Sequence, residues 1–295
     1  MKCGYVALIG RPNVGKSTLM NHILGQKISI TSRKPQTTRH RILGIKTTET
    51  AQMIFMDTPG MHKIEKKALN RYLNKTADTT MAGVDVVVWL IDGFSWHEYD
   101  ESILGKLKQI GLPVILAVNK VDKVKNKEII LSFFEKAQKR FEFKAIIAVS
   151  ALKNIQLEQL ESSIMESLPE SDLIYPEDQI TDRSMRFMAA EIVREKLTRR
   201  LGDELPYAIT VEIERYEEQK NITKIYAVIW VERSTQKNIV IGKQGEMLKK
   251  IGSDARLDIE RLIDQKVYLQ CWVKVKKGWS NSERALQSLG FSDTE

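Results

Sequence analysis

The segment Gly10-Arg11-Pro12-Asn13-Val14-Gly15-Lys16-Ser17 directly follows the apolar run Tyr5–Ile9. It has the G-x-x-x-x-G-K-S spacing of a phosphate-binding loop that joins a strand to a helix. The backbone N–H groups of such a loop and the N-terminus of the next helix bind phosphate oxygens. Lys16 would add a positive charge at the β- and γ-phosphates, and Ser17 would place its hydroxyl on a magnesium ion. The segment therefore predicts a nucleotide site within an α/β fold.

Apolar runs alternate with longer mixed segments throughout residues 1–170. Their high Val and Ile content is typical of strands that are covered on both faces. The expected strands are Tyr5–Ile9, Met53–Met56, Val84–Ile91, Pro113–Val118 and Ala145–Val149, and the expected helices include Ser17–Leu24 and Glu128–Arg140. This pattern predicts a mainly parallel sheet with helices on both faces. The nucleotide is expected at the carboxyl ends of the strands.

Three more polar segments each follow an expected strand. In Asp57-Thr58-Pro59-Gly60 the carboxylate can hold a metal through a water molecule, and Gly60 offers an unhindered N–H to the γ-phosphate. In Asn119-Lys120-Val121-Asp122 the carboxylate can accept hydrogen bonds from guanine N1–H and N2–H₂, whereas adenine has no donor at N1. Ser150-Ala151-Leu152-Lys153 could contact guanine O6 through backbone N–H groups. Together these segments predict GTP or GDP with Mg²⁺.

The order of these four segments resembles the translation-factor-related GTPase superfamily over residues 4–170. Within that superfamily, residues 10–17, the segment Gln36-Thr37-Thr38-Arg39-His40-Arg41 and the sequence DTPG at 57–60 resemble the Era family. The resemblance implies that Thr38, or otherwise Thr37, reaches magnesium when GTP is bound. The metal ligands would then be Ser17, Thr38 and, through water, Asp57. A plain loop or strand role for both threonines stays open.

Met61 stands where signalling GTPases place a glutamine that orients the attacking water. Because its side chain cannot hydrogen-bond usefully to that water, slow intrinsic hydrolysis is expected. In related GTPases the asparagine that corresponds to Asn13 helps to seat potassium, so the resemblance implies K⁺ beside the phosphates. Arg11, Arg39 and Arg41 are alternative sources of that charge, and a polar-loop role for Asn13 stays open. The catalytic candidates are Lys16, Thr38, Gly60 and Asn13.

The acidic, proline-containing stretch Ser167–Thr181 predicts a linker. We therefore expect a GTPase domain at 1–170, a linker at 171–181 and a second domain at 182–295. The second domain should run helix, strand, strand, helix, helix, strand. Its expected elements are a helix at Arg183–Leu201, strands at Ala208–Tyr216 and Lys224–Glu232 with the turn Glu217–Thr223 between them, a helix before Gly242, a helix from Glu246 to about Asp264, and a strand at Val267–Lys276.

Between the two later helices stands Gly242-Lys243-Gln244-Gly245. Its glycines keep Cβ atoms away from approaching phosphates, and Lys243 adds charge. This loop and the element order resemble the KH RNA-binding module, an α+β fold that follows the GTPase domain in the Era family. The resemblance implies a switch in 30S ribosomal subunit assembly that binds 16S rRNA near its 3′ end; a monomer is expected, although the sequence leaves the oligomeric state open. A regulatory GTPase at the membrane surface, with a protein-docking C-terminal domain, stays the alternative.

Composition gives weaker constraints. The formal net charge of +8 favours polyanionic partners, and 42% hydrophobic residues are typical of a globular protein. Without a signal sequence or an apolar run of bilayer-spanning length, we expect a cytoplasmic protein, whose basic clusters could also touch an anionic inner membrane face. Lys274, Lys276 and Lys277 could extend a phosphate track or protect a strand edge. Trp230, Trp272 and Trp279 are expected in packing roles, and Asp85 and Asp92 as turn or capping groups.

Overall fold

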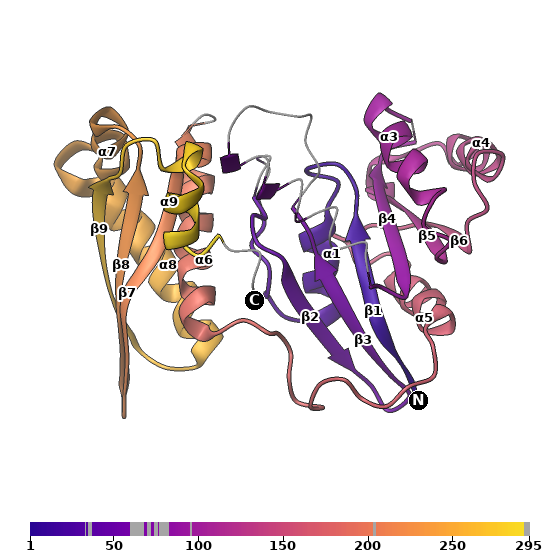
Figure 1. Cartoon of the computed structure of the whole chain (residues 1–295), viewed down its shortest axis with the longest axis horizontal. Coiled ribbons are helices and arrows are strands. Elements are labelled where there is room, and N and C mark those ends of the chain that lie inside the picture. The colour runs from indigo at the N-terminus through magenta and orange to yellow at the C-terminus, as the bar shows by residue number, and fades with distance from the viewer. Residues whose placement is uncertain are drawn as a thin grey trace. The chain divides into compact units, whose positions relative to one another are not determined.

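The computed structural model describes residues 1–32, 34, 37–59, 68–69, 72–73, 76, 83–94, 96–202 and 205–291. These residues form two compact units, which are described separately (Figure 1). The first contains the described parts of Met1–Ser29, Thr38–Lys63 and Leu73–Asp182, and the second those of Ile30–Thr37, Ile64–Tyr72 and Arg183–Glu295. Among the described residues, no helix has both the length and the apolar character needed to span a bilayer.

The first unit is built on a six-stranded sheet in the order β2-β3-β1-β4-β5-β6 (Figure 1). The pair β2–β3 is antiparallel and all other neighbours are parallel, as predicted. The strands are β1 (Lys2–Ile9), β2 (Ile42–Thr47), β3 (Ala51–Asp57), β4 (Val86–Asp92), β5 (Val114–Asn119) and β6 (Ala145–Ala148); the helices are α1 (Lys16–Leu24), α3 (Glu98–Leu107), α4 (Lys127–Gln138) and α5 (Leu157–Ser167), with a short 3₁₀ turn η1 (Val121–Lys123).

Burial explains why the predicted strands were recognisable. Every residue of β3 and β5 is buried, and apart from Gln52, Asp57 and Asn119 these strands carry apolar side chains on both faces. Helix α1 buries Leu19, Met20 and Ile23, which share one face of the helix at a spacing of three and four residues. Because strands β1, β3, β4 and β5 are parallel, their carboxyl ends lie on the same side of the sheet. The polar segments that the sequence predicts to bind the nucleotide are found at these ends.

Strand β2 was not predicted, because Ile42–Thr47 is short, contains a glycine and follows a charged stretch. It lies at the edge of the sheet, where residues beyond α5 bond to it. The Ile45 N–H donates to the Ile180 carbonyl at 2.8 Å, and the Leu43 N–H donates to Asp182 Oδ1 at 3.1 Å. Nearer the start of that segment, Gln52 Oε1 accepts from the Tyr175 N–H at 3.0 Å. The segment 171–181 therefore has fixed partners in the first unit.

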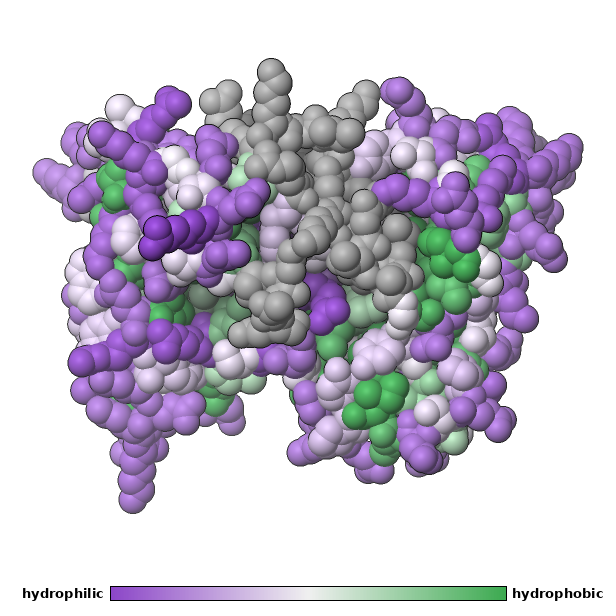
Figure 2. All heavy atoms as spheres, in the orientation of Figure 1, coloured by the Kyte–Doolittle hydropathy of each residue, from purple (hydrophilic) through white to green (hydrophobic). Residues whose placement is uncertain are grey.

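The second unit has the predicted order of helix, strand, strand, helix, helix and strand. Its elements are α6 (Met185–Arg200), η2 (Leu205–Ala208), β7 (Ile209–Gln219), β8 (Ile222–Val231), α7 (Ser234–Ile241), η3 (Lys243–Gly245), α8 (Glu246–Ile263), β9 (Val267–Val275), η4 (Trp279–Asn281) and α9 (Glu283–Ser288). Strand β8 pairs antiparallel with β7 and parallel with β9. Hydrophilic side chains dominate the visible surface of this unit (Figure 2).

Two details of this unit differ from expectation. Strand β7 continues to Gln219 and β8 begins at Ile222, so the turn that connects them is shorter than the predicted turn Glu217–Thr223. The charged residues near the hairpin concealed this extension, because they lie on strand positions that face solvent. Helix α9 was not expected. The unit also includes Ile30–Thr37, where the Thr31 N–H donates to Glu195 Oε1 at 3.0 Å and Arg199 Nε donates to the Thr31 carbonyl at 3.0 Å.

Candidate functional site

The phosphate-loop residues Gly10–Ser17 connect β1 to α1, as the sequence predicts. Gly15 has φ +108, and a Cβ atom there would lie 2.3 Å from the side-chain nitrogen of Asn119. Only glycine fits this position without displacing that amide. The Lys16 ammonium donates to the carbonyl oxygens of Gly10 at 3.0 Å and Arg11 at 3.1 Å. The loop therefore closes around a buried lysine at the start of a helix.

Burial lowers the pKa of Lys16 from 10.5 to about 8, although the nearby charge of Asp57 opposes this shift. Desolvation disfavours an isolated ammonium, whereas an added anion would favour it. The arrangement is consistent with a lysine whose natural partner is a phosphate group.

Four side chains of the first unit meet at the carboxyl end of β3. Asp57 Oδ2 accepts from Ser17 Oγ at 2.7 Å, Ser29 Oγ at 2.7 Å and Thr38 Oγ1 at 3.3 Å. The hydroxyl oxygens of Ser17 and Thr38 are 2.8 Å apart. Sequence reasoning missed Ser29, which belongs to no recognisable motif.

The carboxylate of Asp57 fits a hard cation. Burial raises its pKa, and the hydrogen bonds and the charge of Lys16 oppose that rise. Its Oδ1 atom is buried, and no described residue donates a hydrogen bond to it. A buried carboxylate oxygen beside two hydroxyl oxygens is a donor set that suits Mg²⁺. Ser17, Thr38 and Asp57 could thus hold the metal that the sequence predicts.

The geometry also separates the two switch threonines. Thr37 Oγ1 donates to the Lys34 carbonyl at 2.6 Å and lies 2.7 Å from Ser32 Oγ, so it is engaged within its own segment. Thr38, in contrast, reaches both Ser17 and Asp57. Of the two candidates, Thr38 is the one that contacts the other candidate metal ligands, Ser17 and Asp57.

The predicted base-reading segment begins where β5 ends. Asn119 Nδ2 donates to the Val14 carbonyl at 2.7 Å, and its Oδ1 accepts from the N–H groups of Lys120 at 2.8 Å and Ala151 at 3.0 Å. Asn119 therefore connects three loops. Ser150 Oγ donates to Asp122 Oδ1 at 2.5 Å, which fixes the orientation of the carboxylate assigned to guanine. Leu152, beside them, is exposed.

Asp92, expected as a turn or capping group, instead forms ion pairs with two residues of the candidate nucleotide site. It is the last residue of β4, and it accepts from Arg11 Nη2 at 2.9 Å and Lys120 Nζ at 2.8 Å. Burial raises its pKa, but the hydrogen bond and charge of Lys120 and the charge of Arg11 leave the pKa lowered overall. Asp100 accepts from Arg11 Nε at 3.0 Å. Position at the end of an apolar strand, shared with Asp57 and Asn119, was the available signal.

The remaining candidates are only partly placed. Gly60 and Met61 lie outside the described residues. Thr58, just before them and next to Pro59, donates through Oγ1 to the Leu8 carbonyl at 3.0 Å. Asn13 has φ +64, and its carbonyl oxygen accepts from Lys120 Nζ at 2.9 Å. The potassium role of Asn13 stays a prediction.

In the second unit, the predicted G-x-x-G loop joins α7 to α8. Gly242 has φ +75, and a Cβ atom there would lie 2.6 Å from the Cβ of Met247, so the turn requires glycine. Gln244, at φ +52, also adopts the left-handed region, and Lys243 is exposed. The loop thus turns sharply and presents a lysine to solvent.

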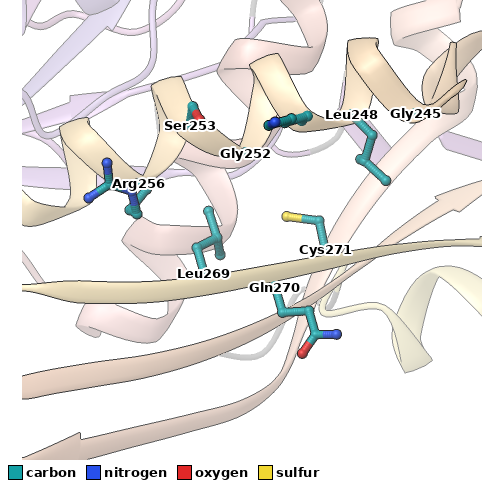
Figure 3. Close-up of a pocket in the computed structure, with 9 residues that line it drawn as sticks. Gly245, Leu248, Gly252, Ser253, Arg256, Leu269, Gln270 and Cys271 are labelled. Carbon is teal, nitrogen blue, oxygen red and sulfur yellow. The ribbon is translucent and has the colours of Figure 1, made fainter. Parts of the chain in front are cut away.

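A cavity of about 380 Å³ begins beside this loop, between α8 and β9. Its lining residues are Gly245, Leu248, Lys249, Gly252, Ser253, Arg256, Leu269, Gln270 and Cys271. Leu269 and Cys271 point toward α8, whereas Gln270 points away from it (Figure 3). Burial raises the pKa of the Cys271 thiol to about 12, so this wall of the cavity is uncharged at neutral pH. Apolar walls with flanking cations suit unstacked bases and their phosphates.

Comparisons with known proteins agree with both units. A family model described as 50S ribosome-binding GTPase matches residues 5–120, and a KH-domain model matches residues 204–280. GTPase Era of Marinobacter nauticus is 59% identical over 99% of this chain and 96% of its own length, and that of Pseudomonas syringae pv. tomato is 56% identical over 99% and 97%.

Solved structures give the same result. A variant of Aquifex aeolicus Era bound to GDP and AlF₄⁻ is 39% identical, with a TM-score of 0.96 over 99% of this chain and 100% of its own. Era in complex with MgGDPNP and nucleotides 1506–1542 of 16S ribosomal RNA matches with the same identity and TM-score over 99% of both chains. With full-length relatives at this identity and with a phosphate loop and a G-x-x-G domain in one chain, the protein belongs to the Era GTPase family.

Proposed function

We propose that this protein hydrolyses GTP with Mg²⁺ and that the bound nucleotide controls its affinity for the 3′ region of 16S rRNA during 30S subunit assembly. The observation that carries the nucleotide half is the meeting of Ser17, Thr38 and Asp57 beside the buried Lys16. These groups supply the oxygen ligands and the charge that a magnesium nucleotide requires.

Each side chain has a defined task in this proposal. Lys16 binds the β- and γ-phosphates, and Asp122, oriented by Ser150, accepts the guanine N–H donors. Ser17 and Thr38 would hold the metal directly, and Asp57 would hold it through water, so that the site gains positive charge to neutralise the phosphates. Thr38 would stay in place while the γ-phosphate site is filled, and its release when that phosphate leaves would provide the switch.

The RNA half of the proposal rests on the G-x-x-G loop and the adjoining cavity. Lys243 and the backbone of Gly242–Gly245 would hold phosphates, and the cavity between α8 and β9 would accept bases. The Era structure bound to nucleotides 1506–1542 of 16S rRNA supports the choice of RNA.

We also propose domains at 1–170 and 182–295 with 171–181 joining them, and a monomer that works in the cytoplasm. Peripheral contact with an anionic membrane is the alternative use of the basic clusters.

The test is RNA binding in two nucleotide states. Purified protein is titrated with a labelled fragment of the 16S rRNA 3′ end, first with magnesium and a non-hydrolysable GTP analogue and then with GDP. The proposal expects tighter binding with the analogue, no such binding of a scrambled fragment, and faster GTP hydrolysis when the matching RNA is added. Equal binding of both RNAs in both states would contradict the switch, and vesicle binding without RNA preference would favour the membrane alternative.

A further inference from the structure

The outer face of the three-stranded sheet in the second unit carries an unusual set of side chains. Ile225, Ala227 and Ile229 of β8 belong to the buried core of the unit. Because side chains alternate along a strand, Tyr226 and Trp230 lie on the opposite face. The same alternation on β9 places Leu269 and Cys271 toward α8 and Gln270 away from it (Figure 3). Tyr268 and Trp272 share the outward side with Gln270.

Three aromatic rings on this face form a continuous group. The rings of Tyr226 and Trp272 are nearly parallel, with 13° between their planes and 5.9 Å between their centroids. The Tyr268 ring lies 6.1 Å from Tyr226 on the other side. Tyr268 is 46% exposed and Trp272 is 38% exposed, which is high for side chains of this size. The sequence expectation that Trp272 serves internal packing is therefore incomplete.

Three cations lie beside aromatic rings of this face, one at Tyr226 and two at Trp230. The Arg215 guanidinium lies 5.7 Å from the Tyr226 ring, and the ammonium groups of Lys274 and Lys276 each lie 5.7 Å from the Trp230 ring. Arg215 also pairs with Glu217, and Lys274 pairs with Glu214. Both pairs are at the surface, where such ion pairs contribute little stability. The cations can therefore exchange a carboxylate for a phosphate at small cost.

The position of this face relative to the cavity indicates the occupant. Strand β9 forms one wall of the cavity through Leu269 and Cys271, and it carries Tyr268 and Trp272 on its other side. The two outward aromatic residues are four positions apart, about 13 Å along a strand. A single-stranded chain that leaves the cavity across the edge of β9 would meet flat rings flanked by cations. That combination binds unstacked bases without regard to sequence.

We propose that the outer face of β8 and β9, formed by Tyr226, Tyr268 and Trp272, is a second binding surface for single-stranded RNA. It takes nucleotides that extend beyond those held by the G-x-x-G loop and the cavity. Its bases stack on the exposed rings, and Arg215 and Lys274 contact the backbone. This inference rests on the proposed RNA-binding function and extends it to a surface outside the cavity.

The test compares RNA length in wild type and variants of the full chain. One RNA has about four nucleotides, enough for a G-x-x-G clamp, and longer RNAs add four nucleotides at the 5′ or the 3′ end. Wild type should bind one of the longer RNAs more tightly than the short one. Trp272→Ala should weaken binding of that longer RNA by about fivefold or more while the short RNA binds as before. Trp272→Phe should retain part of the gain, because it retains a ring.

Controls separate stacking from damage to the fold. Leu257→Ala removes another exposed apolar side chain, on α8, and should leave both affinities unchanged. If Trp272→Ala lowers the thermal unfolding temperature sharply, Tyr268→Ala serves as the deciding variant under the same criteria. Wild type that binds neither RNA refutes the proposed RNA function itself. A length-dependent gain that survives both alanine variants, or no gain in wild type that binds the short RNA, overturns only the second surface.

Discussion

The side-chain amide of Asn119 donates to the carbonyl of Val14 at 2.7 Å, and its nitrogen occupies the space that a side chain at Gly15 would need. The base-reading loop and the phosphate loop are therefore built against each other. Because Asn119 Oδ1 also accepts from Ala151, the third loop of the site depends on the same residue. A substitution at either Gly15 or Asn119 should therefore disturb all three loops of the nucleotide site.

Gly15→Ala tests this connection. A Cβ atom at φ +108 would strain the backbone and displace an amide that makes three hydrogen bonds. Because each buried bond lost costs about 1–3 kcal/mol, we expect nucleotide affinity to fall by about a hundredfold in a titration with fluorescent GDP. Gly25→Ala is the matched control. Gly25 has φ +68 with no atom within 4 Å of the added Cβ, so that variant should lose about 1–2 kcal/mol of stability and keep its affinity.

The lowered pKa of Lys16 predicts that pH has opposite effects on the stability of the fold and on the affinity for GDP. Between pH 8 and 10.5 the unfolded chain keeps a proton on Lys16 that the folded protein has lost, so the contribution of Lys16 to stability rises with pH in this window. Phosphate binds the ammonium form, so affinity for GDP should be full below pH 8 and fall about tenfold for each unit above it. Thermal unfolding and GDP titration from pH 7 to 9.5 measure the two effects.

The control for this pH dependence is Lys16→Arg. The guanidinium stays charged throughout the range, so whatever affinity the variant retains should not fall between pH 8 and 9, where guanine still keeps the N1–H that Asp122 accepts. A decline as steep as that of wild type would mean that another group controls binding.

Lys243→Glu tests the RNA loop. Replacing an exposed cation of the loop with an anion should weaken RNA binding and leave GTP hydrolysis without RNA unchanged. One lost phosphate contact should also lower the slope of log affinity against log salt by about 0.7. Lys220→Glu is the control, because it makes the same change of charge away from the G-x-x-G loop. Lys220 lies in the turn before β8, whereas Lys243 follows α7, which comes after β8. Equal loss in both variants would indicate a general charge effect instead of a clamp.

The sequence predicted those features that one short stretch determines. Strands such as β5 are buried on both faces and therefore read as unbroken apolar runs, and the polar segments that follow them show which ends of the sheet carry the site. Strand β2 was missed although its partner β3 follows it directly, because β2 is short and contains a glycine and its other partners, around Ile180, are distant in sequence. Ser29 and Asp92 were missed or misjudged for the same reason, since only folding brings them to Asp57 and to Arg11.

The potassium hypothesis remains a prediction from the sequence. Met61 cannot orient the attacking water, so a cation near Asn13 would compensate for the missing glutamine. Replacing sodium with potassium should accelerate GTP turnover, and Asn13→Ala should remove that acceleration. Steady-state phosphate release in the two salts measures both. Equal rates in sodium and potassium would instead favour an arginine or a group supplied by RNA; Arg11, which is already paired with Asp92 and Asp100, would be the weaker arginine candidate.

The last prediction concerns how the protein selects guanine over other bases. Ser150 Oγ holds one oxygen of the Asp122 carboxylate, which leaves that group oriented to accept two N–H donors from guanine. Asp122→Asn would present an amide that can donate, and xanthine has an oxygen where guanine has its amino group. The variant should lose about one to two decades of GTP affinity, equivalent to about 1.5–3 kcal/mol, and should bind xanthosine triphosphate more tightly than GTP.

Competition among GTP, ATP and xanthosine triphosphate, with magnesium present, measures this exchange of preference. Ser150→Ala is the control, because it frees the carboxylate without changing its charge or its hydrogen-bonding character. That variant should bind GTP somewhat less tightly and still reject xanthosine triphosphate. A reversal confined to Asp122→Asn can arise only if residue 122 itself contacts the base. If wild type accepted ATP as readily as GTP, or if the asparagine variant kept its guanine preference, the base would have to be read by another loop.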